Sequence, residues 1–204
     1  MARFVTIEGY DGAGKSSLIG ALPLLLPEAS FRVVGRKGEP ELLGISTAIE
    51  REILRPGPET EMTLRIALEL ERERVISRNI AEGHIVLCDR GIISLLAWCK
   101  YLDLASRLYE PLLERLLDYR RDSVNIVCQA DFETCWGRIE ERADKSRKER
   151  EGKDPNEEYF KMYHQTVLES ASAGLDVVTI ETEGLSVLES ACQAVQALKI
   201  RGVV

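Results

Sequence analysis

The segment FVTIEGYDGAGKSS, from Phe4 to Ser17, restricts the possible folds of this chain more than any other part. Gly9 is followed, after four residues, by Gly14-Lys15-Ser16, which is the spacing G-x-x-x-x-G-K-[ST] of a phosphate-binding loop. The apolar, β-branched run before it predicts a buried strand, and the Leu- and Ala-rich run at 16–26 predicts a helix. A strand, a glycine loop and a helix in this order form the arrangement that phosphate binding requires.

The residue types of this loop explain how it would bind an anion. Its glycines let the backbone adopt positive φ and turn its N–H groups toward one point, at which the dipole of the following helix is also directed. Lys15 would add a full charge at the β- and γ-phosphates, and the Ser16 hydroxyl would ligate Mg²⁺. The alternative is a glycine-rich turn that matches by chance, and the flanking strand and helix argue against it. The residues predicted to bind ATP and Mg²⁺ are Gly9, Asp11, Gly12, Ala13, Gly14, Lys15, Ser16 and Ser17.

Length and composition limit the other classes of function. The 204 residues suit one domain, 1–204, and 45% of them are hydrophobic, which is enough for a sizeable core. A net charge of −7 argues against general nucleic-acid binding. The chain shows no apolar signal segment and no run long enough to span a membrane, and its five scattered cysteines form no CxxC pair. We therefore expect a cytoplasmic protein with reduced thiols and no membrane partner.

Apolar runs that predict strands alternate with runs that have helical spacing. The expected strands are 4–7, 31–34, 85–88, 124–128 and 177–180. The expected helices are 16–26, 42–54, 59–81, 92–101, 104–119, 131–142, 156–172 and 185–199. Five short apolar strands separated by helices indicate an α/β fold with a five-stranded parallel sheet covered on both faces.

Charged residues follow two of these strands, at the sheet edge where ligands bind in parallel α/β folds. Asp89 and Arg90 end the third strand: Asp89 would hold the water shell of Mg²⁺, and Arg90 would pair with a substrate phosphate. An ordinary surface ion pair is the alternative. Arg36 follows the second strand, where it would be either a second phosphate clamp or an exposed loop residue.

The most charged part of the chain is EERADKSRKEREGKD, from Glu140 to Asp154, between two predicted helices. A mobile lid with arginines would close over the triphosphate, exclude water and neutralise charge on the transferring phosphoryl group. A plain solvated loop is the alternative reading of such a charge run. We predict a lid over about residues 142–156.

These motifs resemble those of the thymidylate kinase family of nucleoside monophosphate kinases. FVTIEGYDGAGKSS is similar to the opening of that family, and CDRGIISLLAW, from Cys88 to Trp98, is similar to its D-R-Y/H…S…A-Y segment. The resemblance implies a P-loop fold, transfer of the γ-phosphate of ATP to a nucleoside monophosphate, and a homodimer. It also implies two sets of residues: Asp11, Arg36, Arg90 and Ser94 to bind the acceptor, and Lys15 and Arg90, with Arg147 or Arg150 of the lid, for catalysis.

The acceptor-base positions depart from the pattern of this family. The phenylalanine that stacks on the base and the arginine that reads its edge would fall near Arg65 and near Leu68 or Glu69, and neither residue type is kept. Gly91 stands where the family has Tyr or His. The resemblance therefore implies retained phosphate machinery and an altered base pocket, in which Arg65 is a candidate acceptor-binding residue.

A second resemblance leaves another function open. CQADFETCWGRIEER, from Cys128 to Arg142, is similar to the corresponding segment of deoxynucleoside kinases, which phosphorylate the nucleoside itself. Arg36 favours a monophosphate acceptor weakly, because a nucleoside needs no phosphate clamp. A nucleotide-binding regulator without turnover is a third reading, against which the several lid arginines argue, because a pure binder does not need them.

Overall fold

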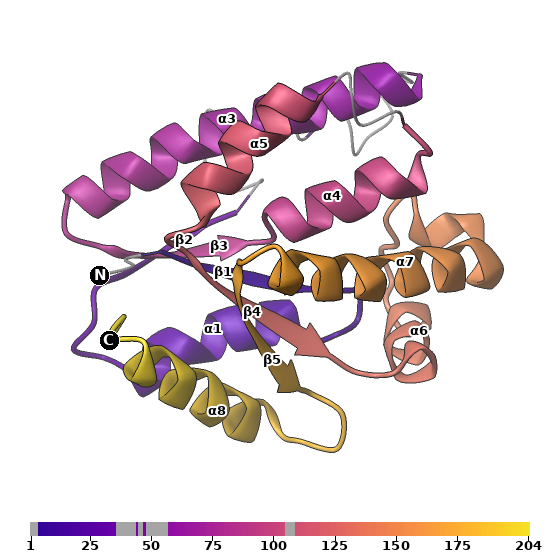
Figure 1. The fold of residues 1–204 in the computed structure, drawn as a ribbon. Helices are drawn as coiled ribbons and strands as arrows, with labels where there is room; N and C mark the ends of the chain where they lie inside the picture. Colours follow the sequence, from indigo (N-terminus) through magenta and orange to yellow (C-terminus); the bar gives the residue numbers. More distant parts are fainter. Residues whose placement is uncertain (1–3, 36–43, 45–46, 48–56, 105–108) are drawn as a thin grey trace.

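Five parallel strands form the centre of the computed structural model, which describes residues 4–35, 44, 47, 57–104 and 109–204. The strands are β1 (Phe4–Gly9), β2 (Phe31–Val34), β3 (Ile85–Asp89), β4 (Val124–Gln129) and β5 (Asp176–Glu181). Their order across the sheet is β2-β3-β1-β4-β5, and every neighbouring pair is parallel. The α/β fold and five-stranded parallel sheet predicted from the sequence are confirmed in the described part of the chain (Figure 1).

Helices cover both faces of this sheet (Figure 1). They are α1 (Lys15–Leu25), α3 (Pro58–Ala81), α4 (Ile92–Tyr101), α5 (Glu110–Arg120), α6 (Phe132–Glu140), α7 (Lys153–Ser172) and α8 (Val187–Ile200), with a short 3₁₀ helix, η2 (Glu149–Glu151), before α7. α1 and α8 lie side by side on one face, and α3, α4, α5 and α7 lie on the other. Such helical crossovers are what allows neighbouring strands to run parallel.

The central strand β1 is buried along its whole length. Val5 and Ile7 have no exposed surface and belong to the same core cluster as Leu87 of β3 and Ile126 of β4. Parallel strands covered on both faces have continuous apolar sequences, which is the pattern that predicted them. The edge strands β2 and β5 are more exposed, so the position of the sheet depends mainly on β1 and its two neighbours.

The register of the central strands determines where the following segments emerge. Ile7 of β1 pairs with Asp89 of β3, and Gly9 pairs with Cys128 of β4. The glycine loop therefore leaves the sheet between the ends of β3 and β4, at the carboxyl edge. Segments that lie 79 and 81 residues apart in the sequence meet at this edge.

Some boundaries differ from those predicted. Of the helix predicted over 104–119, residues 105–108 lie outside the described residues, and the described helix α5 runs from Glu110, with Pro111 in its first turn, where proline is favoured. α7 begins at Lys153, three residues before the predicted start, since Gly152 with φ 98° turns the chain into it. The helix predicted over 42–54 falls largely outside the described residues.

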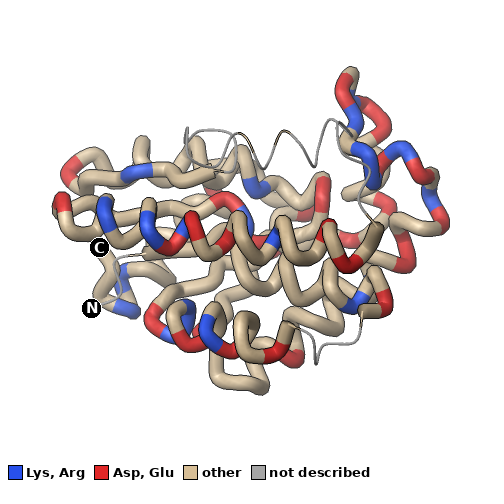
Figure 2. Tube along the Cα trace, turned by 90° about the horizontal axis from the view of Figure 1, so that it is seen from above, with Lys and Arg blue, Asp and Glu red and all other residues tan. Residues whose placement is uncertain are grey.

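Basic and acidic residues are interspersed along the helices (Figure 2). In the part of the chain that the structure describes, the helices seen from this side carry both signs. Within the described ranges, no helix combines the length and the apolar character needed to cross a bilayer.

A buried group of charges behind the carboxyl edge ties the ends of two strands together. The Arg72 guanidinium of α3 donates hydrogen bonds to the carbonyl oxygens of Asp89 (3.0 Å) and Arg90 (2.8 Å), and to one in β2 (3.3 Å). Glu69, one turn earlier, accepts from Arg72 (2.8 Å) and from Arg120 of α5 (3.1 Å). All three charged side chains are at most 1% exposed, so the Glu69 carboxylate compensates the buried charges of both arginines.

Neutralising Glu69 should therefore destabilise the fold far more than neutralising a nearby surface carboxylate. Glu69→Gln is expected to lower the free energy of unfolding by about 3–5 kcal/mol, because it leaves two buried guanidinium groups uncompensated. The matched control is Glu71→Gln on the same helix, whose partner Arg74 is 80% exposed; we expect a change within about 0.5 kcal/mol. Urea unfolding measures both, and equal losses would contradict the account.

Candidate active site

The glycine loop has the backbone conformation that its sequence predicts. Gly9, Gly12 and Gly14 adopt φ values of 144°, 84° and 90°. A Cβ on Gly9 would lie 2.6 Å from the carbonyl oxygen of Cys128, and one on Gly12 would lie 2.3 Å from that of Cys135. Glycine is thus required both by the conformation and by the closeness of β4 and α6. α1 begins at Lys15 directly after the loop, so the loop N–H groups and the helix N-terminus share one site.

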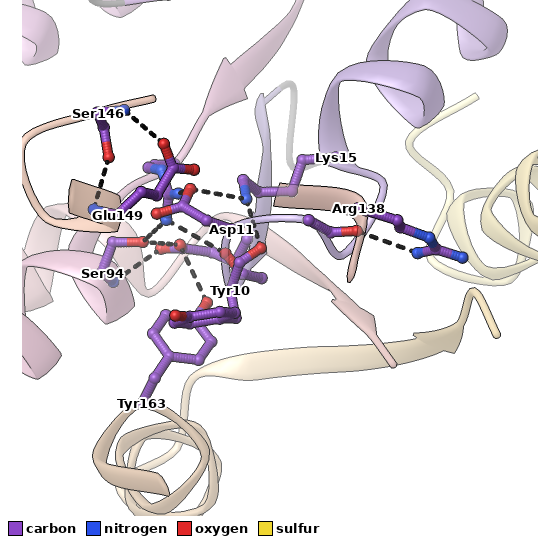
Figure 3. A network of polar contacts seen from close by, with 12 residues as sticks. Tyr10, Asp11, Lys15, Ser94, Arg138, Ser146, Glu149 and Tyr163 are labelled. Carbon is purple, nitrogen blue, oxygen red and sulfur yellow. Dashed lines mark hydrogen bonds and ion pairs between the residues drawn. The ribbon is translucent and has the colours of Figure 1, made fainter. Parts of the chain in front are cut away.

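Lys15 is the buried charge of this loop. Its Nζ donates a hydrogen bond to the carbonyl oxygen of Tyr10 (2.7 Å) and lies 3.8 Å from Oδ1 of Asp11 (Figure 3). Burial, together with the positive charge of Arg90, lowers the pKa of Lys15 to about 8. The ammonium group is therefore held in a site where an added anion would compensate it.

A cavity of about 320 Å³ opens beside the loop. Residues of the loop, of α6 and of the β5–α8 segment line it; they are Gly12, Gly14, Lys15, Ser16, Ser17, Leu18, Arg138, Arg142, Thr182, Leu185, Val187 and Ser190. Its volume is in the range of small-molecule sites, and its polar groups converge on the phosphate loop. Of the eight residues predicted to bind ATP, five line this cavity. The other three do not line it: Asp11 lies beside Lys15, the Ala13 side chain is buried, and Gly9 is the last residue of β1.

Two side chains that the sequence reasoning did not select stabilise the loop from outside. Arg138 of α6 donates to the carbonyl oxygens of Gly12 (3.0 Å) and Thr182 (3.3 Å) (Figure 3). The Thr182 hydroxyl donates to the carbonyl oxygen of Ala13 (3.0 Å). The only available signal for Thr182 was its place after the last strand, at the carboxyl edge of the sheet.

Arg90 and Asp11 meet at the other side of the loop. Arg90 has a left-handed φ of 63°, its backbone N–H donates to the carbonyl oxygen of Ile7 (2.9 Å), and its Nη1 donates to that of Gly9 (3.2 Å). Its Nη2 forms an ion pair with Oδ1 of Asp11. Pairing of β1 with β3 thus brings together two residues predicted to bind the acceptor.

Ser94, another predicted acceptor ligand, is buried, with only 5% of its surface exposed. Its hydroxyl donates to Oε2 of Glu8 (2.5 Å) and accepts from Nη1 of Arg90 (3.4 Å). Figure 3 shows Ser94 and Tyr163 of α7 converging on this point from two helices. Glu8 was not selected from the sequence, because a single glutamate in an apolar strand carries no signal of its own.

The predicted lid is tied down at its base in this structure. Lys148, Glu149 and Asn156 are at most 6% exposed. The Asn156 carboxamide oxygen accepts from the Tyr10 hydroxyl (3.0 Å), and Glu149 accepts from Arg142 (3.0 Å). The first contact fixes the end of the segment against the glycine loop, and the second joins two residues within the segment.

The lid arginines lie in three different environments. Arg147 donates to both carboxylate oxygens of Glu61 on α3 (2.9 and 2.8 Å). Arg150 donates to the carbonyl oxygen of Lys145 (2.9 Å) on the outer surface. Arg142 lines the cavity beside the phosphate loop. Arg147 thus points toward α3, whereas Arg142, which was not predicted to be catalytic, lies at the cavity beside the glycine loop.

Arg65 occupies the region where the resemblance implies the base pocket. Its guanidinium carbon lies 4.3 Å from the centre of the Trp98 ring, and its Nε and Nη2 donate to Glu61 (3.0 and 2.6 Å). The Trp98 indole N–H also donates to Glu61 (3.1 Å), so this buried tryptophan has a polar role besides packing. Arg36, the second predicted phosphate clamp, lies outside the described residues.

Ser16 and Asp89 have the donor atoms that Mg²⁺ prefers. Ser16 is exposed in the first turn of α1, and Asp89 ends β3 opposite Ile7 of β1. In the described ranges, no cluster of three or more His, Cys, Asp or Glu side chains forms a metal site. Mg²⁺ usually takes one or two protein oxygens together with substrate phosphates and water, and the residues present fit that ion.

Sheet order, glycine loop and flanking arginines define a P-loop nucleotide-binding fold. The family model "Thymidylate kinase" matches residues 7–190. Thymidylate kinase of Mesoplasma florum is 30% identical over 162 residues, which cover 74% of each chain. That of Halalkalibacterium halodurans is 39% identical over 105 residues, 48% of this chain and 49% of that protein, so this match spans about half of the relative.

The solved structure of thymidylate kinase from Candida albicans has the same fold. It superposes with a TM-score of 0.72 over 98% of this chain and 92% of that one, at 14% identity, which supports the fold alone. The family match extends over most of the chain. This protein therefore belongs to the thymidylate kinase family of phosphotransferases.

The lowered pKa of Lys15 gives the site a pH dependence. A lysine is charged below its pKa, so kcat/KM for ATP should be constant below about pH 7 and fall as the pH rises through about 8. Lys15→Arg is the control, because a guanidinium stays charged and any residual activity should not fall. Steady-state rates measure both profiles, and a flat wild-type profile to about pH 9.5 would refute the electrostatic role of Lys15.

Proposed function

We propose that this protein transfers the γ-phosphate of ATP to a deoxynucleoside monophosphate, with dTMP as the first candidate acceptor. The observation that carries the proposal is the closeness of two groups at the carboxyl edge of the sheet: the loop with Lys15, which would bind the triphosphate, and the Arg90–Asp11 pair, which would bind the acceptor. Family membership supports the same reaction. We further propose that 1–204 forms one kinase domain that acts in the cytoplasm as a homodimer.

The reaction needs positioning and charge compensation more than covalent chemistry. An oxygen of the acceptor phosphate bonds to the γ-phosphorus, the bond to the β–γ bridging oxygen breaks, and ADP leaves with that electron pair. Lys15 compensates the charge on the β- and γ-phosphates, and Arg90 holds the acceptor phosphate beside Asp11. Mg²⁺, held through Ser16 and Asp89, would neutralise the phosphate charge and align the oxygens.

A lid arginine completes the proposed charge compensation. Arg147 and Arg150 are the candidates from the sequence, and the position of Arg142 on the cavity adds a third. Arg147 would have to leave Glu61 to reach the phosphates, and Arg150 would have to turn inward from the outer surface. Arg142 pairs with Glu149 but already lines the cavity, so we propose it as the arginine that would reach the phosphates with the least movement.

The acceptor base would be read by Arg65 and its neighbours. A guanidinium stacked on Trp98 and fixed by Glu61 offers a planar, charged platform, in contrast to the apolar ring that the family resemblance implies at this position. This difference supports an altered base pocket, so an acceptor other than dTMP would also be consistent with the site.

The test is ADP release from ATP and Mg²⁺ against a panel of ribo- and deoxynucleoside monophosphates and free nucleosides. We expect turnover with a deoxynucleoside monophosphate, and a loss of about 100-fold or more in kcat/KM for Lys15→Ala, with the fold retained by circular dichroism. Turnover with nucleosides alone would support a nucleoside kinase instead. ATP binding without turnover of any acceptor would support a nucleotide-binding regulator.

Comparison of the lid arginines tests which one acts. Arg142→Gln is expected to lower kcat by about 100-fold or more with little change in KM for ATP, because the arginine would act in the transition state. Arg147→Gln and Arg150→Gln are the matched variants, and we expect smaller losses from both. A larger loss from either one would assign the role to that residue and contradict the assignment to Arg142.

A further inference from the structure

Glu8, the residue before the glycine loop, is an ionisable side chain with no exposed surface. Its Oε1 accepts hydrogen bonds from the backbone N–H groups of Ile93 (3.1 Å) and Ser94 (3.3 Å). Its Oε2 accepts from the hydroxyl groups of Ser94 (2.5 Å) and Tyr163 (3.3 Å). A buried carboxylate with four donors from two helices holds its surroundings rigid. The proposed transfer reaction assigns no step to it.

The direction of the hydrogen bonds links Glu8 to Arg90. A guanidinium can only donate, so the Ser94 oxygen accepts from Nη1 of Arg90. A serine hydroxyl has one proton, and this proton is donated to Glu8. Glu8 therefore determines which way the Ser94 hydroxyl faces, and Ser94 in turn presents its lone pairs to the arginine.

Glu8 also takes the place of the missing cap of α4. The N-cap residue Gly91 has no side chain, and Glu8 supplies an acceptor to two N–H groups of the first turn. A Cβ at Gly91 would lie 2.6 Å from Cγ2 of Thr6 and 3.4 Å from Oε1 of Glu8. The start of α4, immediately after Arg90, thus packs closely against β1, and this close contact requires glycine at position 91.

We propose that Glu8 is a positioning residue for the acceptor-phosphate site. Through Ser94 and the first turn of α4 it fixes the Arg90 guanidinium beside Asp11, where it would meet the acceptor phosphate. The proposal rests on the proposed function, in which Arg90 holds that phosphate. Ser94 then acts as the link between the two charges and not as a direct ligand of the substrate. Tyr163 connects the same carboxylate to α7, the helix that follows the lid.

Four variants separate this role from a general effect on folding. Ser94→Ala removes the link, and Glu8→Gln removes the charge that orients it. Ser170→Ala is the control for the first, since Ser170 is a buried serine whose hydroxyl has no hydrogen-bond partner among the described residues. Glu73→Gln is the control for the second, since Glu73 is a buried carboxylate paired with the exposed Arg115, away from the site.

The measurement is KM for ATP and for dTMP, or for the monophosphate turned over fastest in the panel, together with the thermal unfolding midpoint. Ser94→Ala and Glu8→Gln are expected to raise KM for the acceptor about 10-fold and to change KM for ATP less than about 2-fold. The double variant should be no worse than Glu8→Gln alone, because the two residues act in series. Both controls should leave both KM values unchanged.

Arg90→Ala in the same assay separates the positioning role of Glu8 and Ser94 from the proposed function, in which Arg90 holds the acceptor phosphate. If Arg90→Ala raises KM for the acceptor but Ser94→Ala does not, the positioning role is refuted and the proposed function stands. If Arg90→Ala leaves KM for the acceptor unchanged, both are refuted. Equal increases in both KM values for Ser94→Ala would also overturn the positioning role. If Glu8→Gln does not fold, Ser94→Ala carries the test alone.

Discussion

Parallel pairing of β1 with both β3 and β4 is the constraint on which the site depends. Because β1 is buried along its whole length, its register with its neighbours is fixed by packing, and a shift by one residue would turn each of its side chains to the opposite covered face of the sheet. The same register sends the glycine loop between the ends of β3 and β4. Arg90 then lies beside Asp11, and Arg138 lies behind Gly12, although 79 and 126 residues separate these pairs. Folding of the sheet therefore brings together the residues of the proposed phosphate sites.

Several buried charged side chains lie at the carboxyl edge of the sheet. Lys15, Glu8 and Arg72 are each at most 8% exposed, and each is compensated by carbonyl oxygens, by donors or by another charge. Electrostatic interactions are stronger where water is excluded, so these groups hold one another in place and respond strongly to an incoming anion. Burial of the ammonium group, together with the charge of Arg90, lowers the pKa of Lys15 to about 8. A phosphate that enters the site would replace protein carbonyl and carboxylate oxygens as partners of the lysine and of Arg90.

The sequence predicted the features that depend on local chemistry and missed those that depend on distant contacts. The loop from Gly9 to Ser16 follows from its glycines, and the strands follow from continuous apolar runs, so both could be recognised without a structure. Glu8 could not, because its partner Ser94 is 86 residues away and one polar residue does not alter the pattern of a strand. The pairing of Arg147 with Glu61, also 86 residues apart, was likewise invisible. The lid was predicted from the charge of its segment, but the burial of Lys148 and Asn156 follows from tertiary packing alone.

The central claim is that the donor and acceptor phosphate sites lie on the two sides of one strand end. A crystal structure with a bisubstrate analogue, adenosine and thymidine joined by five phosphates, tests it most directly. The account predicts that the phosphate chain runs from the glycine loop and Lys15 to the Arg90 guanidinium. A phosphate chain that occupies the loop but leaves the sheet edge away from Arg90 would contradict it.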